Sequence, residues 1–339
     1  MCLGIAALAA VGVALAVRPP SALQRATRTV EIPATLGVLG IARHLAEQGV
    51  IQSQVVFVGL TVLRGTARSL KAGEYEVPQG APLLAVLQLL ETGRVKPHLL
   101  VLPEGSTIRD LARQIEAEGI AAAGDVVPVA GSPRMAWSLG IESDSLEGYL
   151  FPDTYQVTKG VRVEEILGRM VQRFRERAGT ADVVARARQR GLSLHQLVTL
   201  ASIVEKEAAL AAERPVIARV FLNRLQRDMP LQADPTVAYA LAKEGRPPTR
   251  EDLQVDHPFN TYKNRGLPPG PIGSPGRAAI DAVLEPADVP YLYFVAIDDR
   301  AHHFSTTLEE HNQAVARYRQ HRARARVTST LAPARGPVL

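Results

Sequence analysis

The pattern of apolar and polar positions divides the chain into an apolar start, a short α+β region and a long helical region. From residue 28 to residue 101, strand-like runs alternate with amphipathic helical patterns, two of which stop at Gly49 and Gly93. The expected strands are 29–33, 70–77 and 97–101, the expected helices are 36–49, 82–92 and 107–119, and an apolar run covers 55–63. This alternation predicts a compact α+β module.

From residue 161 onward the pattern is predominantly helical, after an Ala-, Gly- and Pro-rich stretch at 121–132 that marks a soft boundary beginning near residue 97. One strong strand, 291–297, occurs late in the chain, and the sequence does not name its neighbours. The predicted fold class is therefore α+β, with a mainly helical second domain and a small sheet. The expected helices are 163–178, 181–190, 193–211, 215–227, 236–243, 276–284 and 308–321.

The first residues form an uncharged apolar run, Met1 to Val17, which Arg18-Pro-Pro20 ends. Because a bilayer span takes roughly 20 residues, an uncleaved anchor and a cleaved signal peptide both fit this run. The absence of a clean Ala-x-Ala-like site beyond the apolar core favours an N-terminal membrane helix at 1–17. Either alternative places most of the chain outside the cytoplasm.

Composition narrows the function classes. The chain of 339 residues is 46% hydrophobic and 22% charged, which is typical of a folded protein and excludes disorder of the whole chain. Its single cysteine, Cys2, excludes a disulfide framework and a thiolate zinc cluster in the rest of the chain.

The net charge of +5 comes from the C-terminal region, where six arginines and no acids follow Glu310. We interpret 323–339 as a basic, disordered tail rather than a contact with anionic lipid. Nucleic-acid binding is not supported, because no aromatic residues alternate with these arginines and the export signal argues against it.

A helical pattern that opens at Ser193 carries the first candidate for catalysis. Ser193 and Gln196 form a capping-box pattern, and the apolar residues that follow gather in one arc at about 100° per residue. Glu205 lies about 60° from the centre of this arc, at the edge of the buried stripe. Glu207 falls near the far rim and Lys206 points away, so the sequence ranks Glu205 above Glu207.

A glutamate at the edge of a helix is more often a surface residue or half of a salt bridge. A carboxyl group packed against apolar side chains, however, keeps its proton nearer to neutral pH, because desolvation penalises the charged form. That property is required of the general acid that cleaves a glycosidic bond. The choice between these alternatives depends on the motifs around Glu205.

Several motifs accompany Glu205 in one order, and four of them lie on three loops stiffened by proline or glycine. They are Leu146-Glu-Gly-Tyr-Leu-Phe-Pro-Asp-Thr-Tyr155, Ala201-Ser-Ile-Val-Glu-Lys-Glu207, Val220-Phe-Leu-Asn-Arg-Leu225, Leu231-Gln-Ala-Asp-Pro-Thr-Val237, Asn260-Thr-Tyr262, Gly266-Leu-Pro-Pro-Gly270 and Tyr291-Leu-Tyr-Phe-Val295. With these motifs the chain resembles the endolytic murein transglycosylase family (MltG, YceG-like) over residues 28–322. The resemblance implies a single-pass protein of the bacterial inner membrane, a LysM-like module at 28–98 and an extracytoplasmic (periplasmic) YceG-like catalytic domain at 99–322.

The resemblance also implies a reaction. Glu205 would protonate the oxygen between N-acetylmuramic acid and N-acetylglucosamine in nascent peptidoglycan, and its carboxylate would then take the proton of the muramic C6 hydroxyl. The oxygen of that hydroxyl bonds to C1 and forms a 1,6-anhydro ring. The reaction therefore consumes no water and requires no metal or other cofactor. The expected partners are peptidoglycan glycan strands and cell-wall synthases, the penicillin-binding proteins.

Polar and aromatic residues on the stiff loops are the candidates for substrate binding. Gln232, Asn260 and Tyr262 suit hydrogen bonds to acetamido and hydroxyl groups of the glycan, or they brace their own loops. Tyr149 and Phe151 are candidates for stacking on a sugar face, although aromatic residues beside Gly148 and Pro152 more often pack a turn.

Three further side-chain sets bear on rival functions. Asp153 and Asp234 fit helix or turn caps better than catalysis. A metal site at His302, His303 and His311 is disfavoured, because no carboxylate or thiol stands at ligand spacing. The rival functions are a two-carboxylate hydrolase that pairs Glu205 with Asp234 or Asp153, and a wall-binding scaffold without turnover.

Overall fold

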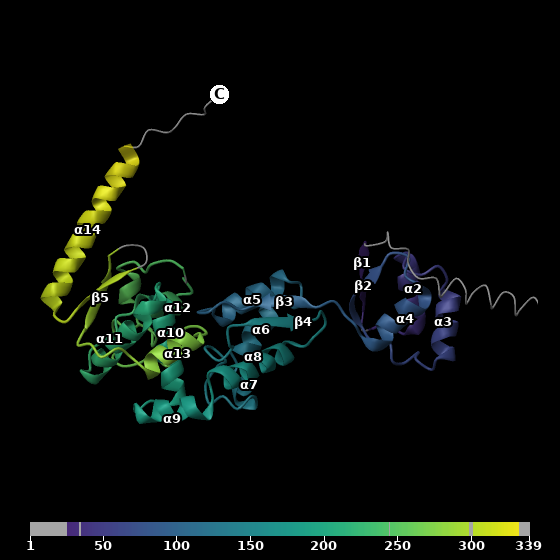
Figure 1. Ribbon diagram of the computed structural model, residues 1–339, viewed down its shortest axis with the longest axis horizontal. Helices are drawn as coiled ribbons and strands as arrows, with labels where there is room; N and C mark the ends of the chain where they lie inside the picture. Colours follow the sequence, from purple (N-terminus) through teal and green to yellow (C-terminus); the bar gives the residue numbers. More distant parts are fainter. Residues whose placement is uncertain (1–25, 34, 244, 298–300, 332–339) are drawn as a thin grey trace, which may run out of the picture. The chain divides into compact units, whose positions relative to one another are not determined.

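The computed structural model describes residues 26–33, 35–243, 245–297 and 301–331 (Figure 1). The predicted membrane helix at 1–17 and residues 332–339 of the predicted tail lie outside this range. Among the described residues, no helix combines the length and apolarity that a membrane crossing requires. The chain forms two compact units. Unit 1 comprises the described part of Met1–Leu100 with Gln114–Ala122 and Thr154–Arg162, and unit 2 comprises Val101–Arg113, Ala123–Asp153 and the described part of Val163–Leu339.

Unit 1 is an α+β unit, as the alternating pattern predicts. Strands β1 and β2 pair antiparallel, with Val30 opposite Tyr75, and the short strands β3 and β4 form a second pair. The apolar run at 55–63 belongs to a helix, α3, whose N-cap Ser53 accepts a hydrogen bond from the amide of Val56. The elements are β1 (Thr27–Ile32), α2 (Val38–Glu47), α3 (Gln54–Leu63), β2 (Gly73–Pro78), α4 (Leu83–Thr92), β3 (His98–Val101) and β4 (Thr154–Val157).

The core of unit 1 forms where the first two strands meet the three helices. Phe57 of α3 and Leu87 of α4 are fully buried, and Tyr75 of β2 is 1% exposed. Gly93 ends α4 in the left-handed conformation at φ 68°, as the sequence predicts, because glycine adopts this conformation without a steric penalty. Unit 1 therefore has its own hydrophobic core.

Unit 2 is mainly helical and is organised around α10, which packs against α9, α11, α12 and α13 (Figure 1). Every residue of α10 from Leu197 to Val204 is buried. The hairpin of β5 and β6 pairs Phe294 with Phe304 and supplies the neighbour of the late strand. The elements are α5 (Ile108–Ala117), whose end belongs to unit 1, α6 (Ala123–Ala130), α7 (Pro133–Ser138), α8 (Val163–Arg177), α9 (Ala181–Gln189), α10 (Leu194–Glu207), α11 (Arg214–Gln226), α12 (Asp234–Ala240), α13 (Arg277–Leu284), β5 (Tyr293–Ala296), β6 (His302–Ser305) and α14 (Leu308–Leu331), with single 3₁₀ turns at Ala211–Glu213 and Asp252–Gln254.

Among the differences from the prediction, three concern the segments at 121–132, 193–211 and 323–331. The stretch at 121–132 contains a helix, α6, because Val126 and Ala130 are buried in unit 2. Helix α10 ends at Glu207, four residues before the predicted end at Ala211. Helix α14 continues to Leu331 in place of the disorder predicted for 323–331, since alanine and arginine, which are frequent here, are strong helix formers.

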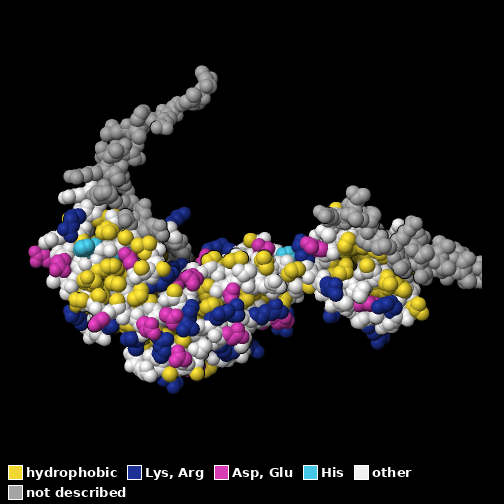
Figure 2. Space-filling model, viewed as in Figure 1, with side chains coloured by type: hydrophobic (Ala, Val, Ile, Leu, Met, Phe, Trp, Pro, Cys, Tyr) yellow, Lys and Arg dark blue, Asp and Glu magenta, His cyan; other side chains and the backbone are white. Residues whose placement is uncertain are grey.

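Both signs of charge occur on the surface of each unit. On the face shown in Figure 2, Lys and Arg side chains are interspersed with Asp and Glu side chains instead of gathering in a basic stripe. Such a stripe is the electrostatic mark of a nucleic-acid-binding surface. The face shown in Figure 2 therefore has no basic stripe of the kind that binds nucleic acid.

Candidate functional site

The last turn of α10 places two acidic side chains in different surroundings. The helix begins with the predicted capping box, in which Ser193 and Gln196 bond each other's backbone amides, and it ends at Glu207 because Ala208 turns into an extended conformation. Glu205 and Glu207 both belong to this last turn, on either side of Lys206. The contacts of Glu205 connect neighbouring helices, whereas Glu207 lines a cavity.

Glu205 points inward, as the helical wheel predicts, and its side chain is 5% exposed. One carboxylate oxygen accepts a hydrogen bond from Arg214 Nη2 at 2.8 Å, and the other accepts one from the amide of Gly276 at 3.0 Å. Arg214 is the first residue of α11 and Gly276 is the N-cap of α13. Glu205 therefore ties three helices together with both oxygens occupied, which does not support the predicted role as the acid.

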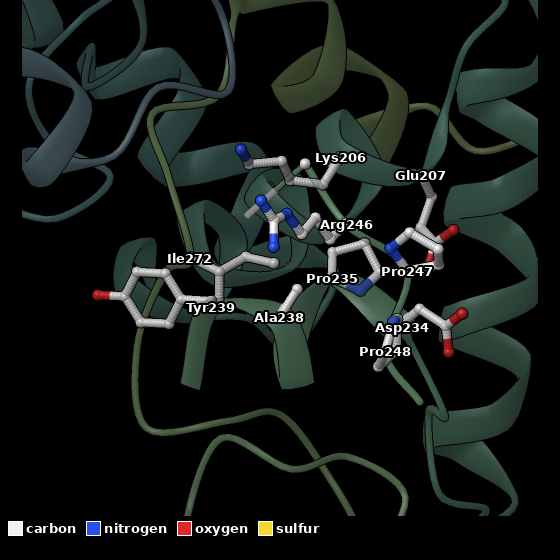
Figure 3. A pocket seen from close by; sticks show the side chains of 11 residues that line it. Lys206, Glu207, Asp234, Pro235, Ala238, Tyr239, Arg246, Pro247, Pro248 and Ile272 are labelled. Carbon is white, nitrogen blue, oxygen red and sulfur yellow. The ribbon is translucent and has the colours of Figure 1, made fainter. Parts of the chain in front are cut away.

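Glu207 instead lines a cavity of about 380 Å³, together with Asp234, Lys206, Tyr239 and Arg246 (Figure 3). Figure 3 shows the carboxyl groups of Glu207 and Asp234 at one end of the cavity and the Tyr239 ring at the other. The pKa of Glu207 is raised to about 8, mainly by burial and also by the negative charge of Asp234, against the opposing charge of Arg224. Glu207 thus holds a proton at neutral pH beside an open cavity.

Asp234 shares the cavity with Glu207 and is fixed by Tyr262. The Tyr262 hydroxyl donates to Asp234 Oδ1 at 2.5 Å. Burial, this hydrogen bond and the charges of Asp234 and Glu207 all raise the Tyr262 pKa, so the hydroxyl keeps its proton. Asp234 lies inside the first turn of α12 without capping it, because the N-cap is Ala233. The other candidate acid, Asp153, forms an ion pair with Arg173 at 2.6 Å.

The loop before Asp234 depends on Arg224, a buried cation that no sequence pattern singled out beyond its motif. Arg224 donates to the carbonyl oxygens of Leu231 at 2.8 Å and Leu292 at 2.7 Å. Gln232 follows in the left-handed region at φ 51° with an exposed side chain. The predicted substrate contact of Gln232 is therefore sterically open.

Asn260, in contrast, braces its loop. The residue is 1% exposed, and its side-chain nitrogen Nδ2 donates to the carbonyl oxygens of Leu253 and Val255 at 3.1 and 2.8 Å. Its side-chain oxygen accepts from the amide of Tyr262 at 3.0 Å. Because Asn260 is buried and its side chain is engaged by these three partners, the structure favours the bracing alternative over a direct contact with substrate.

Tyr149 and Phe151 lie in the core of unit 2, with 2% and 8% of their surfaces exposed. The ring of Tyr149 packs edge-on against Phe174 at 5.2 Å, and its hydroxyl contacts His195 Nδ1 at 2.9 Å. Neither ring presents a face on which a sugar can stack. The predicted sugar-stacking role is therefore replaced by the packing of the turn, which is the alternative that the neighbouring Gly148 and Pro152 suggest.

Gly148, in the loop at 146–155, packs closely against Pro271 of the loop at 260–275. Its φ is 82°, and a Cβ atom at this position would lie 2.4 Å from Pro271 Cβ and 3.0 Å from Val198 Cγ1. We expect Gly148→Ala to lower the free energy of unfolding by about 2–4 kcal/mol, from backbone strain and overpacking. Gly266→Ala is the control, because Gly266 has φ 80° with no neighbouring atom within 4 Å and should cost only about 1–2 kcal/mol. Equal losses in urea unfolding would contradict the proposed close packing.

Glu147 is a buried acid beneath the site that sequence reasoning did not single out, although it belongs to a quoted motif. Burial raises its pKa to about 7, against hydrogen bonds from the Ile108 amide and the Tyr239 hydroxyl, each at 3.2 Å. The signal available in the sequence was an acid between Leu146 and Gly148, in a run without other charges until Asp153. Glu147 holds Tyr239, which forms a wall of the cavity.

The histidines considered for a metal site have other contacts. His302 Nδ1 lies 2.7 Å from Glu213 Oε2, and the His311 ring stacks on Tyr293 at 5.3 Å. Within the described ranges, no group of three or more His, Cys, Asp or Glu side chains is arranged to hold a metal ion. The described cavity offers proton chemistry through Glu207 and polar contacts through its neighbours.

Comparisons with known proteins agree with the motifs. The YceG-like family matches residues 30–317. The chain is 34% identical to an endolytic murein transglycosylase of Bacillus subtilis (strain 168) over 87% of this chain and 85% of that protein. It is 30% identical to an endolytic murein transglycosylase of Streptococcus pneumoniae serotype 2 (strain D39 / NCTC 7466), over 86% of this chain and 58% of that protein.

A solved structure agrees as well. The crystal structure of a yceG-like protein from Listeria monocytogenes is 36% identical to the chain, covers 85% of this chain and 99% of its own, and superposes with a TM-score of 0.59. The family match spans most of the chain and includes α10 with both of its terminal acids. The chain belongs to the YceG-like family.

Proposed function

We propose that the chain is a lytic transglycosylase that cleaves peptidoglycan glycan strands, with Glu207 as its proton donor in place of Glu205. The observation that carries this proposal is the carboxyl group of Glu207, which lines the cavity with its pKa raised to about 8. A general acid works best when its pKa lies near the operating pH. The names of the relatives, endolytic murein transglycosylases, support the reaction and the substrate.

The reaction needs one group that gives a proton and then takes one. Glu207 protonates the glycosidic oxygen as the bond from that oxygen to muramic C1 breaks. The glutamate then accepts the proton of the muramic C6 hydroxyl, whose oxygen bonds to C1 and forms the 1,6-anhydro ring. The proton count of Glu207 is thereby restored, and no water is consumed.

The neighbours of Glu207 have distinct parts in this step. The carboxylate of Asp234, held by Tyr262, stabilises the positive charge that develops at C1. Lys206 and Arg246 line the same cavity and can donate hydrogen bonds to sugar hydroxyl and acetamido oxygens. Gln232 is the exposed polar residue of the adjoining loop and is assigned a contact with the strand.

The products test the proposed reaction. Purified protein incubated with peptide-free glycan strands is expected to release fragments with 1,6-anhydro-muramic ends, which mass spectrometry separates from hydrolytic ends by the mass of one water. Reducing muramic ends in their place would overturn the transglycosylase and favour the rival hydrolase. The pairing of Glu207 with Asp234 gives that hydrolase two carboxyl groups in one cavity. Binding to sacculi without any released fragment would instead favour the scaffold.

Location and accessory binding complete the proposal. The apolar run at 1–17 anchors the protein in the cytoplasmic membrane, with both units on the extracytoplasmic side. The β1–α4 part of unit 1, which has its own core, acts as a LysM-like module that binds glycan. Cell-wall synthases of the penicillin-binding class deliver nascent strands to unit 2.

A further inference from the structure

A second cavity of about 410 Å³ in unit 2 lies next to the first. The two cavities share Tyr239, and consecutive residues of one loop line them, Ile272 the first and Pro271 the second. Because Tyr239 belongs to both linings, the second cavity adjoins the Glu207 cavity at this ring. Nothing in the proposed proton transfer uses this second cavity.

Three aromatic side chains, Trp137, Tyr239 and Phe259, are part of the lining of the second cavity. Trp137, on the short helix α7, is 61% exposed although it is the largest apolar side chain of the molecule. Phe259 lines the same cavity and packs against Tyr239 with ring centroids 5.1 Å apart. An exposed indole beside two further rings leaves apolar area available for a ligand.

Polar side chains make up another part of the lining. Glu142, Ser143, Asp144 and Ser145 are consecutive residues that offer carboxylate and hydroxyl oxygens. His195 completes it with both ring nitrogens engaged, since Nε2 donates to the Pro269 carbonyl at 2.8 Å and Nδ1 accepts from the Tyr149 hydroxyl at 2.9 Å. This fixed ring cannot turn away when a ligand enters.

We propose that the second cavity binds sugar units of the same glycan strand, next to the bond that is cleaved, with Trp137 as the surface on which a sugar ring stacks. A pyranose ring has apolar C–H faces and hydroxyl donors at its edge, which match a cavity lined by an indole together with carboxylate and serine oxygens. This inference rests on the proposed function for the identity of the strand.

Trp137 also supplies the means to test the inference, because it is the only tryptophan of the chain. Glu207→Gln protein is titrated with peptide-free glycan strands while tryptophan emission is recorded. A saturable blue shift or quench is expected, and Phe259→Ala in the same background should weaken binding roughly tenfold through the loss of one aromatic contact. Val127→Ala is the control, because Val127 is an exposed apolar residue of α6 in the same unit.

Cleavage assays separate this inference from the proposed function. In the wild-type background, Trp137→Ala should lower kcat/KM for long strands by roughly tenfold through a raised KM, and should have less effect on a short fragment that fills only the Glu207 cavity. Wild-type cleavage with no change in emission and no effect of Trp137→Ala overturns the second subsite alone. An emission change without any cleavage overturns the proposed function and leaves the glycan-binding subsite standing.

Discussion

Glu207→Gln is expected to lower kcat for glycan cleavage by roughly a thousandfold, because glutamine keeps the shape of the side chain but cannot transfer a proton as an acid. The carboxyl group of Glu207 lines the cavity, and its raised pKa keeps it protonated below about pH 8. Release of glycan fragments with 1,6-anhydro-muramic ends from peptide-free strands measures the effect. Glu205→Gln, assayed on folded protein, is the matched control, because the same replacement two residues earlier removes no proton donor from the cavity.

The pH profile adds an independent check on the same residue. The wild-type kcat/KM should fall as the pH rises through about 8, because ionisation of Glu207 removes the donated proton. Asp234→Asn should move this alkaline limb to lower pH, because the negative charge of Asp234 raises the Glu207 pKa. Full activity of Glu207→Gln, together with loss of activity in folded Glu205→Gln, would return the catalytic role to Glu205.

Glu205→Gln is expected to have its largest effect on stability, with a loss of about 2–4 kcal/mol in the free energy of unfolding. The carboxylate joins Arg214 and the Gly276 amide inside the protein, and the Arg214 side chain is only 15% exposed. Glutamine cannot neutralise the buried guanidinium and offers a single acceptor oxygen for two donors. Urea unfolding at neutral pH measures the loss.

Glu104→Gln is the control for this stability prediction. Glu104 lies 3.7 Å from the same guanidinium, but its side chain is 49% exposed. Burial and the neighbouring charge of Glu205 raise the Glu104 pKa, so its charge adds little net stabilisation. A change below about 1 kcal/mol is expected. A larger loss from Glu104→Gln than from Glu205→Gln would show that Glu104, and not Glu205, is the carboxylate that stabilises Arg214.

Much of the fold was readable from the sequence, because many of its helices show an apolar periodicity and some carry clear start or stop signals. The helix stop at Gly93 and the capping box at Ser193 both appear where local chemistry predicts them. The partner of the late strand was not readable, since β6 carries two histidines and little apolar alternation. Although β5 and β6 form a hairpin, β6 lacks the apolar alternation by which a strand is recognised in a sequence.

The choice between the two acids shows where local reasoning ends. A helical wheel assumes that a helix has one buried face, and it correctly predicted that the Glu205 side chain points inward. Helix α10 is instead buried on all sides from Leu197 to Val204, so burial does not distinguish the side that faces a ligand. The cavity around Glu207 is formed by residues far along the chain, at Asp234 and Arg246, whose approach to α10 no spacing predicts.

The last turn of α10 therefore carries a bracing acid and a reactive acid only two positions apart. A single inserted residue after Val204 would rotate both side chains by about 100° and shift them along the axis by about 1.5 Å. Arg214 would then lose its carboxylate and the cavity would lose its proton donor in one event. The spacing of residues along α10 therefore decides which acid meets Arg214 and which one enters the cavity.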